Sequence, residues 1–506
     1  MSTKRLLTNS GSNLLVMFLK IAITFVMTPI FVHNLGAYDY GVWEITLSVI
    51  GYMGILDLGM LPTMARFAAH HRARAEEEQL FQTFASSVVF MGAVGMVLSL
   101  VFLVWAVAFP HTLADEGQET TRYTIFLLII GAQILVSFPG YVATSFLEGF
   151  QHFAAKNNIV LVNTVVSSII TIVFITPENA LILVAALNAI GTIIKHLYYF
   201  YLLRTERYGN VQFRLRDFFW PKLHELLVFG SKSFIQGASY RIANFSDNVV
   251  IGFFLGPAQV MLFSLPNAIV RNIRMVVANV TQVFLPFFTE LNATGDHEQA
   301  RHYYISASRY VTSVVMLITA VTVVTGADFI SVWIDPVTGA KSEIVLYVLL
   351  AYTSVTLINP FYSRYLTAIG KHGLFAYWEP PMALANIAIS LVLVHWLGLV
   401  GVALGTLIPN VVLHIVYLRA SMHHLGVPVS RFLWSSLAPN LVPSLLTVLY
   451  LLWFEWQWPL TGWGPLLLAM TSGSVLYLLL YLGVGAPADR RALVQLLRHR
   501  RGWIQR

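Results

Sequence analysis

Two arginine and two amide side chains share one face of the apolar segment 258–288. Arg271 and Arg274 are three residues apart, so both guanidinium groups leave the same side of a helix. Asn267 lies one turn before them and Gln282 about two turns after them, which extends the polar stripe. Guanidinium groups bind phosphates and carboxylates through paired hydrogen bonds. The stripe therefore predicts one wall of a cationic cavity that holds an anion.

A second polar stripe lies in the apolar segment that precedes this one. Gln236, Tyr240 and Asn244 are spaced four residues apart, and Asp247 follows three residues later. Arg241 lies next to this face. Polar faces on membrane helices point towards other helices or towards water. We therefore expect this stripe to line the same interior.

Two further ionisable groups, Lys20 and Glu44, interrupt the first and second apolar segments. Charged groups deep in a membrane are costly, about 2.5–3.5 kcal/mol each on insertion scales, so we expect them to have functional roles. Four deep cations outnumber two deep acids, and an excess of fixed positive charge attracts anions such as phosphates. The cations are Lys20, Arg241, Arg271 and Arg274, and the acids are Glu44 and Asp247.

The composition identifies an all-α polytopic membrane protein. Of 506 residues, 57% are hydrophobic and 11% are charged, whereas soluble domains carry about 25% charged residues. The apolar runs are too long and continuous for the alternating strands of an outer-membrane barrel. Runs of about 20 apolar residues predict fourteen spans, at 12–33, 40–62, 83–109, 123–146, 158–176, 180–202, 226–254, 258–288, 304–327, 344–369, 374–398, 400–420, 432–454 and 464–485.

The loops between these spans alternate in charge. One set is basic and includes Arg72, Lys156, Arg216 and Lys371, whereas the longest loops of the opposite set carry acids such as Asp328. Lys and Arg accumulate in cytoplasmic loops, so both termini are predicted to be cytoplasmic. The chain has no cysteine, which excludes disulfides and thiolate metal sites. We expect neither a bound metal nor a cofactor.

The chain also repeats itself about every 220 residues. Three motif pairs recur at this offset, and six spans separate the copies, so the halves have the same orientation. The pairs are Gly11-Ser12 with Gly230-Ser231, Leu35-Gly36-Ala37 with Leu255-Gly256-Pro257, and Pro139 with Pro360. The resulting domains are a six-helix lobe (1–203), a basic linker (204–225), a second six-helix lobe (226–421), two extra helices (422–485) and a basic tail (486–506).

The linker combines arginines with aromatic side chains. Arg214 and Arg216 are followed by Phe218, Phe219 and Trp220. This composition is typical of an amphipathic segment at the level of the lipid headgroups. A plain cytoplasmic loop that follows the positive-inside rule explains the same residues equally well.

Several motifs resemble a known family. Their order along the chain resembles the signature of Wzx-type O-antigen and polysaccharide flippases, which belong to the superfamily of multidrug and toxin extrusion exporters and lipid II flippases. The motifs are Leu35-Gly36-Ala37, Tyr40-Gly41, Leu56-Asp57-Leu58-Gly59, Arg66-Phe67, and Asp247 followed by Ile251-Gly252 and Gly256-Pro257.

The resemblance implies both an architecture and a function. Two six-helix lobes would form a V around a central cavity, followed by two extra helices. The protein would move an undecaprenyl-diphosphate-linked oligosaccharide from the inner to the outer leaflet of a bacterial inner membrane by alternating access. Arg271, Arg274, Arg241 and Lys20 would hold the diphosphate.

For such a substrate, physical reasoning adds roles for the remaining polar residues and for partners. Gln236, Tyr240, Asn244 and Gln282 would bind sugar hydroxyls, with Asn267 in the same wall. Glu44 and Asp247 would be candidates for coupling to a proton or a sodium ion. Membrane lipids and other polysaccharide-assembly proteins would be further partners.

Two other functions stay open. A multidrug or cation exporter of the same superfamily would depend on the deep acids instead of the deep cations. A polytopic polysaccharide polymerase or ligase would carry catalytic charges on a long external loop, whereas the external loops here reach about 15 residues. The sequence contains no phosphate-binding glycine loop, zinc-binding helix or other catalytic motif, so a transporter is favoured over an enzyme. No nucleic-acid partner is expected, because membrane topology already explains the basic residues.

Overall fold

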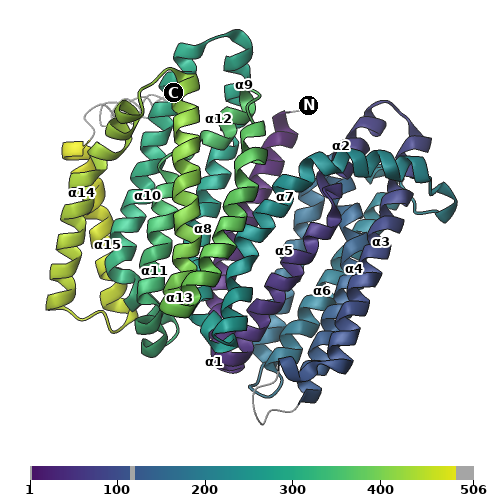
Figure 1. Ribbon diagram of the computed structural model, residues 1–506, viewed down its shortest axis with the longest axis horizontal. Helices are drawn as coiled ribbons and strands as arrows, with labels where there is room; N and C mark the ends of the chain where they lie inside the picture. Colours follow the sequence, from purple (N-terminus) through teal and green to yellow (C-terminus); the bar gives the residue numbers. More distant parts are fainter. Residues whose placement is uncertain (1–2, 114–119, 486–506) are drawn as a thin grey trace, which may run out of the picture. The chain divides into compact units, whose positions relative to one another are not determined.

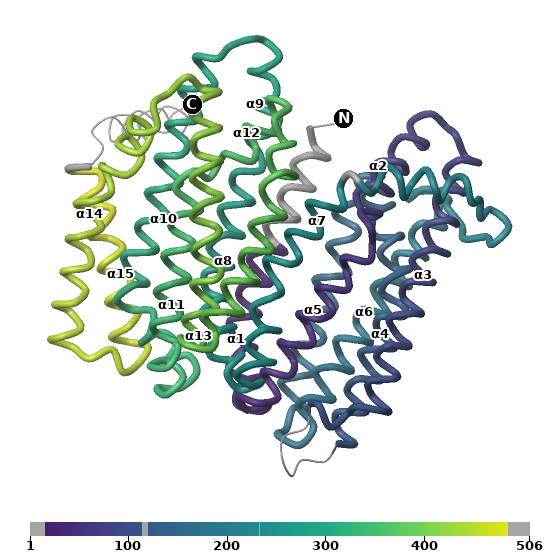
Figure 2. The backbone as a smooth tube through the Cα atoms, in the orientation of Figure 1, coloured from purple at the N-terminus to yellow at the C-terminus, as the bar shows by residue number. Residues whose placement is uncertain are grey.

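The computed structural model describes residues 3–113 and 120–485, and within them the chain is helical with no β-strand. Figures 1 and 2 show the helices as long, roughly aligned rods within each part of the chain. The basic tail and three predicted loop acids, Asp115, Glu116 and Glu119, lie outside the described residues. The helices are α1 (Thr3–Met53), α2 (Met60–Ala73), α3 (Glu77–Ala108), α4 (Thr120–Gly149), α5 (Phe153–Phe174), α6 (Ala180–Arg204), α7 (Trp220–Phe254), α8 (Pro257–Gln282), α9 (Phe284–Thr294), α10 (His297–Trp333), α11 (Pro336–Leu357), α12 (Tyr362–Ala368), α13 (Gly373–Leu425), α14 (Val429–Gln457) and α15 (Trp463–Leu480).

The number of membrane-spanning segments agrees with the sequence. Eleven helical stretches of the described chain are long and apolar enough to cross a membrane. Two of them, α1 and α13, contain a break at Gly36 and at Gly398, so each provides two spans. If the 35-residue helix α7 also crosses the membrane, the described chain accommodates the fourteen spans that the sequence predicts. The prediction of an all-α polytopic membrane protein is confirmed.

The chain divides into two compact units, residues 1–245 and 246–506. In the first unit α4 is central, because it packs against α2, α3 and α6, while α5 packs against α1 and α6. Large aromatic side chains fill this core, and Phe84 of α3 meets Phe146 of α4 with 4.8 Å between ring centres. The division into six-helix lobes, linker and extra helices, and the V around a central cavity, stay predictions.

In the second unit α10 and α11 pair with each other and with the helices around them. α8 and α13 pack against α11, while α14 and α15 pack against α10. A hydrophobic cluster joins Val321 and Val324 of α10 to Leu451 of α14 and Leu466 of α15. The two predicted extra helices are therefore fixed to α10, as Figure 1 shows in yellow beside the green of that helix.

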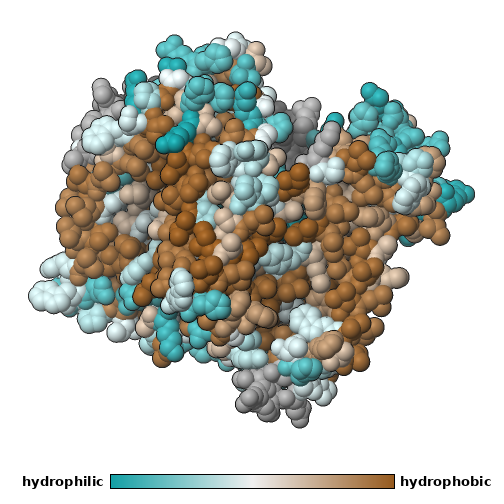
Figure 3. Space-filling model, in the orientation of Figure 1, coloured by the Kyte–Doolittle hydropathy of each residue, from teal (hydrophilic) through white to brown (hydrophobic). Residues whose placement is uncertain are grey.

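The surface of each unit matches a membrane environment. Valines such as Val104 of α3 and Val173 of α5 are exposed, at 56% and 65%. Figure 3 shows hydrophobic side chains over the middle of the helices and hydrophilic side chains near their ends. Apolar surface of this extent is stable only when lipid covers it.

Three predicted spans are interrupted in the structure. Within 344–369, α11 ends at Leu357 and α12 begins at Tyr362, and within 258–288, α8 ends at Gln282 and α9 begins at Phe284. The sequence predicts a helix over 40–62, but the regular helix ends at Met53 and a short 3₁₀ segment, η1 (Gly54–Asp57), follows. Leu58 and Gly59 then adopt left-handed conformations, with φ of 51° and 75°. The Asp57 carboxylate accepts a hydrogen bond from the Gly59 amide (2.8 Å), which stabilises this turn. Apolar residues continue through the turn, so hydropathy alone misses it.

The predicted repeat has a local counterpart in the backbone. Gly36, between the two spans of α1, has φ 70° and ψ 172°. Gly256, between α7 and α8, has φ 88° and ψ 159°. Positive φ favours glycine, which lacks the Cβ atom that would clash. Each copy of the motif thus uses its glycine to form the same sharp connection between two spans.

Candidate functional site

The two arginines of α8 lie near the middle of a 26-residue helix. Arg271 is exposed, and Arg274 is half-buried with its guanidinium 4.6 Å from the ring centre of Tyr352. The buried Nη1 atom of Arg274 has no hydrogen-bond partner. Within the described part of the chain, neither arginine forms an ion pair with a carboxylate. Both groups therefore keep hydrogen-bonding capacity for an anion.

The other two predicted residues of this stripe are less constrained. Asn267 is half-buried, two turns inside the N-terminal end of α8, and Gln282 is the exposed last residue of the helix. Their predicted contact with a substrate stays a prediction.

Asp247, near the C-terminal end of α7, is buried with 7% of its surface exposed. One carboxylate oxygen accepts a hydrogen bond from the Thr406 hydroxyl (2.9 Å), and the other is buried without a partner. The Asn386 side-chain amide donates to the Thr406 oxygen (3.0 Å), and the Ser246 hydroxyl donates to the Asn386 carbonyl (3.1 Å). Arg274 interacts electrostatically with Asp247. Within the second unit, the α7 carboxylate and one α8 arginine are thus close enough for their charges to interact.

The break in α13 places these partners beside Asp247. Gly398 (φ 55°, ψ −129°) ends the first half of α13 and starts the second, so that residues 386 and 406 come together. The two halves pack closely: a Cβ atom added to Gly405 would lie 2.0 Å from Ser390 Oγ. A glycine hinge and a close helix contact therefore position amide and hydroxyl groups around one carboxylate. Oxygen ligands of this kind suit a small cation or a proton.

Arg241, in the first unit, already has an anionic partner. Its Nη2 atom lies 3.0 Å from the Asp57 carboxylate, and its Nη1 atom is 3.4 Å from the Gly51 carbonyl oxygen. A cavity of about 140 Å³ adjoins this pair. Asp57, to which the sequence assigned no role, is thus the anionic partner of Arg241 within the first unit. The diphosphate-binding role of Arg241 stays a prediction.

Glycines allow the turn around Asp57 to approach α7. A Cβ atom on Gly59 would lie 2.2 Å from the carbonyl oxygen of Gly230, and one on Gly54 would lie 2.1 Å from Arg241 Nη1. Such distances are well inside van der Waals contact, so any larger residue would separate the two segments. This explains physically why the Leu56-Asp57-Leu58-Gly59 motif combines an acid with a glycine.

The remaining predicted residues of the first unit are mostly accessible. Lys20 and Gln236 are exposed, and Tyr240 is 65% exposed. The Asn244 side chain is exposed but donates to the Tyr240 carbonyl oxygen (2.8 Å). Glu44 is half-buried within α1. Their roles in sugar binding, diphosphate binding and ion coupling stay predictions.

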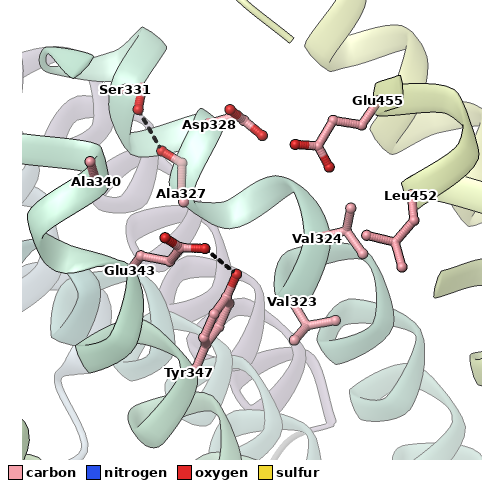
Figure 4. A pocket seen from close by; sticks show the side chains of 10 residues that line it. All are labelled: Val323, Val324, Ala327, Asp328, Ser331, Ala340, Glu343, Tyr347, Leu452 and Glu455. Atoms are coloured by element: carbon pink, nitrogen blue, oxygen red, sulfur yellow. Dashed lines mark hydrogen bonds between the residues drawn. The ribbon is translucent and has the colours of Figure 1, made fainter. Parts of the chain in front are cut away.

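A larger cavity of the second unit carries the opposite charge. It has a volume of about 410 Å³ and is lined by Asp328 of α10, Glu343 of α11 and Glu455 of α14 (Figure 4). The Tyr347 hydroxyl donates to Glu343 (2.6 Å). Three carboxylates repel a phosphate, so this cavity is not the predicted anion site.

Sequence reasoning missed three residues that the structure brings to these sites. Asn386, Thr406 and Asp57 were not assigned functional roles, although each lies in a predicted span. Asn386 and Thr406 are isolated polar residues in two apolar segments. A polar residue in such a segment indicates a functional or packing role, which was the only available signal. Thr406 bonds Asp247, 159 positions away, and Asn386 bonds Ser246, 140 positions away, so only packing reveals these contacts.

The fold defines a class of protein, the polytopic α-helical membrane proteins. The solved lipid II flippase MurJ, in an inward closed conformation, is similar over 97% of this chain and 100% of that chain, with a TM-score of 0.69 and 14% identity. An inward-facing multidrug resistance MATE transporter of the MOP superfamily is similar over 80% of this chain and 94% of that one, with a TM-score of 0.66 and 17% identity. At these identities the likeness establishes the fold.

The family follows from the sequence itself. The profile of a family described as polysaccharide biosynthesis protein matches residues 6–292, more than half of the chain. The chain belongs to this family, which confirms the resemblance drawn from the motifs. A putative O-antigen transporter of Shigella flexneri is 21% identical over 255 residues, 50% of this chain and 59% of that protein. The curated relatives are matched over less than two thirds of their own length, 65% and 59%.

Proposed function

We propose that the protein is a flippase that moves a diphosphate-linked lipid oligosaccharide across a bacterial inner membrane. Membership of the polysaccharide biosynthesis family and the likeness to a putative O-antigen transporter support a glycan substrate. The observation that carries the proposal is the pair of arginines in the middle of α8, which have no carboxylate partner among the described residues. A cation excess at this depth suits a lipid diphosphate and is unsuited to a cationic drug.

The physical task explains why arginines are placed there. The head of a lipid-linked oligosaccharide carries two phosphates and many hydroxyl groups, which hydrocarbon cannot solvate. Arg271 is exposed and would bind the diphosphate first, while Arg274 has an unsatisfied Nη1 atom that would complete a second contact. The lipid tail would stay in the bilayer during this transfer. Alternating access would then release the head on the other side.

The buried carboxylate of Asp247 is the proposed site of energy coupling. Its unpaired carboxylate oxygen and the Thr406 hydroxyl oxygen offer the oxygen ligands that a small cation binds, and the Asn386 amide holds the Thr406 hydroxyl in place. A proton on the same oxygen is the alternative. Movement of one elementary charge through the membrane potential contributes roughly 2.3 kcal/mol per 100 mV, enough to bias a transport step. Arg274 links this site to the anion site, since it interacts electrostatically with Asp247.

The first experiment tests the diphosphate clamp. A polysaccharide-producing host that lacks its own copy of the gene is complemented with R271A/R274A. Each charge-assisted hydrogen bond contributes about 1.5–3 kcal/mol, so we expect substrate affinity to fall by roughly two to four orders of magnitude and surface glycan to disappear. The control is K371A/R419A, which removes two exposed cations at predicted cytoplasmic positions. Normal surface glycan in R271A/R274A, with equal protein in the membrane, would exclude the clamp.

The second experiment tests coupling in proteoliposomes that contain the purified protein and a lipid-diphosphate oligosaccharide. Transport by the unsubstituted protein should depend on a sodium or a pH gradient, and D247N should abolish that dependence. The exposed acid Glu290 offers a matched control, E290Q. Gradient-dependent transport in D247N would remove Asp247 from the mechanism. Unchanged surface glycan with increased drug susceptibility in the deletion host would instead favour the multidrug exporter.

A further inference from the structure

The linker between α6 and α7 is an ordered surface segment that is attached at both ends. At its start the Val211 amide donates to the Leu203 carbonyl oxygen (2.7 Å), and Val211 is buried. At its end the buried Ser86 hydroxyl of α3 accepts from the Phe219 amide (3.0 Å) and donates to the Phe219 carbonyl oxygen (3.2 Å). These three hydrogen bonds fix the segment in one place on the first unit.

Contacts with neighbouring loops support the same segment. The Tyr208 ring lies 4.8 Å from the His152 ring, and the backbone at Gly209 (φ 139°) approaches Phe150 so closely that a Cβ atom would lie 2.5 Å from it. The Arg72 guanidinium packs over the Phe150 ring, 4.3 Å from the ring centre. The linker, the α4–α5 loop and the end of α2 thus gather at one end of the unit. This is the end that the positive-inside rule predicts to be cytoplasmic.

The attached segment exposes large apolar side chains on its surface. Leu215 is 69% exposed and Trp220 is 65% exposed, while Phe213 and Phe219 are also exposed. In a membrane protein such side chains are stable when they enter the layer of lipid headgroups. Figure 3 shows hydrophilic side chains over this end of the unit, next to the hydrophobic surface of the spans.

Exposed arginines alternate with these apolar residues. Arg214 and Arg216 flank Leu215, and both are exposed. The segment also carries exposed Arg204 and Arg207, whereas its acids are Glu206 and Asp217, the latter 3.8 Å from Arg216. Lys222 is buried and paired with Glu225 (2.7 Å), so it does not contribute to the surface charge. Four exposed cations against two acids leave a positive surface.

The position of the linker brings this surface to the membrane. α6 has 25 residues and α7 has 35, which correspond to lengths of about 37 and 52 Å, against a hydrocarbon thickness of about 30 Å. The ends of both helices therefore extend into the headgroup layer, and the linker joins them there. Because the apolar side chains and the arginines occur together at this depth, a lipid surface fits better than a soluble partner.

We propose that residues 204–220 dock onto the acidic phospholipids of the leaflet that faces this end of the protein. Leu215, Phe219 and Trp220 insert between headgroups, and Arg207, Arg214 and Arg216 bind lipid phosphates. The docked linker holds the junction of α6 and α7 at a fixed depth in the membrane. This proposal does not depend on the identity of the transported molecule.

The absence of cysteine makes a direct test practical. The exposed Gln212 is replaced in Q212C, the single thiol carries a bimane fluorophore, and the full chain is placed in nanodiscs that contain a nitroxide-headgroup lipid. We expect stronger quenching in phosphatidylcholine with phosphatidylglycerol than in phosphatidylcholine alone. One arginine at an acidic surface corresponds to roughly a fivefold change in the docked-to-undocked ratio, so R207Q/R214Q/R216Q should lower this ratio on the order of a hundredfold.

A matched control removes three exposed cations elsewhere, in K371Q/R419Q/R431Q, and should leave quenching unchanged. A second measurement raises the salt concentration and uses Q212C with all its arginines in place. Salt weakens the attraction between arginines and lipid phosphates, because the Debye length falls from about 10 Å at 0.1 M to about 3 Å at 1 M. Quenching should then decrease in the acidic nanodiscs. Equal quenching in both lipid mixtures, equal loss in both triple variants, or no effect of salt would each overturn the proposal.

Discussion

The ion pair between Asp57 and Arg241 is the contact in the first unit whose energy is easiest to isolate. D57N keeps the size of the side chain and a carbonyl oxygen that can still accept the Gly59 amide hydrogen bond. R241Q removes the guanidinium and its contact with the Gly51 carbonyl oxygen. The double variant D57N/R241Q completes a cycle, so the interaction energy of the pair follows from four unfolding measurements.

The expected magnitude follows from the partial burial of the pair. The Arg241 side chain is 27% exposed and that of Asp57 is 12% exposed, with 3.0 Å between the charged atoms. Fully exposed pairs contribute about 0–1 kcal/mol, whereas loss of one partner of a fully buried pair costs about 3–5 kcal/mol. We therefore expect a coupling energy of about 1–2 kcal/mol, with R241Q alone costing about 1–3 kcal/mol.

Unfolding in mixed micelles with increasing sodium dodecyl sulfate provides the assay, with Trp fluorescence as the signal. A coupling energy below about 0.5 kcal/mol would refute the argument, since it would place the pair among screened surface contacts. Transport by the same variants separates two roles of Arg241. If Arg241 only supports the fold, D57N and R241Q will reduce transport equally. If Arg241 also binds diphosphate, R241Q will abolish transport, whereas D57N will only reduce it.

Three further predictions follow from named contacts. G59A should prevent stable insertion, because alanine is strained at φ 75° and its Cβ atom would lie 2.2 Å from a backbone oxygen. A fusion reporter of folding would measure the amount of inserted protein, and a normal amount of G59A would contradict the prediction. T406V should raise the apparent dissociation constant of the coupling cation about tenfold, whereas T406S should restore it, because only the hydroxyl reaches Asp247. The hydrogen bond from His71 lowers the pKa of the Glu76 carboxyl, so its contribution to stability is present above the pKa of the unfolded carboxyl and is lost as pH falls through the lowered value. Thermal melts of E76Q should thus depend less on pH on the acid side, and an unchanged dependence would contradict this.

The two polar sites of the second unit suggest a division of roles. Among the described residues the α8 arginines have no ion-pair partner, while Asp247 provides a buried carboxyl group with incomplete hydrogen bonding. Their electrostatic interaction means that an anion on Arg274 and a cation on Asp247 influence each other's affinity. The effect is reciprocal, so substrate binding should change cation affinity by the same factor. Isothermal titration of either ligand, with and without the other, measures this coupling.

The sequence alone determined the membrane character, the helical class, the fourteen spans and the polar stripe of α8. These features are local, because the hydropathy of about 20 consecutive residues decides whether a segment enters the bilayer. Helical periodicity likewise placed Arg271 and Arg274 on one face without knowledge of their neighbours. At Gly36 and Gly256 the sequence showed a repeated motif, but it did not predict the positive φ of these two residues.

Tertiary structure alone decided which charges are paired. Arg241 binds Asp57, 184 positions away, and Asp247 binds Thr406, 159 positions away. No periodicity encodes such distances, since they depend on the turn at Leu58 and Gly59 and on the hinge at Gly398. A charged residue within an apolar segment of the sequence therefore indicates that a partner is needed, because burial of an unpaired charge is costly. Packing determines whether that partner is another side chain or is left to a ligand.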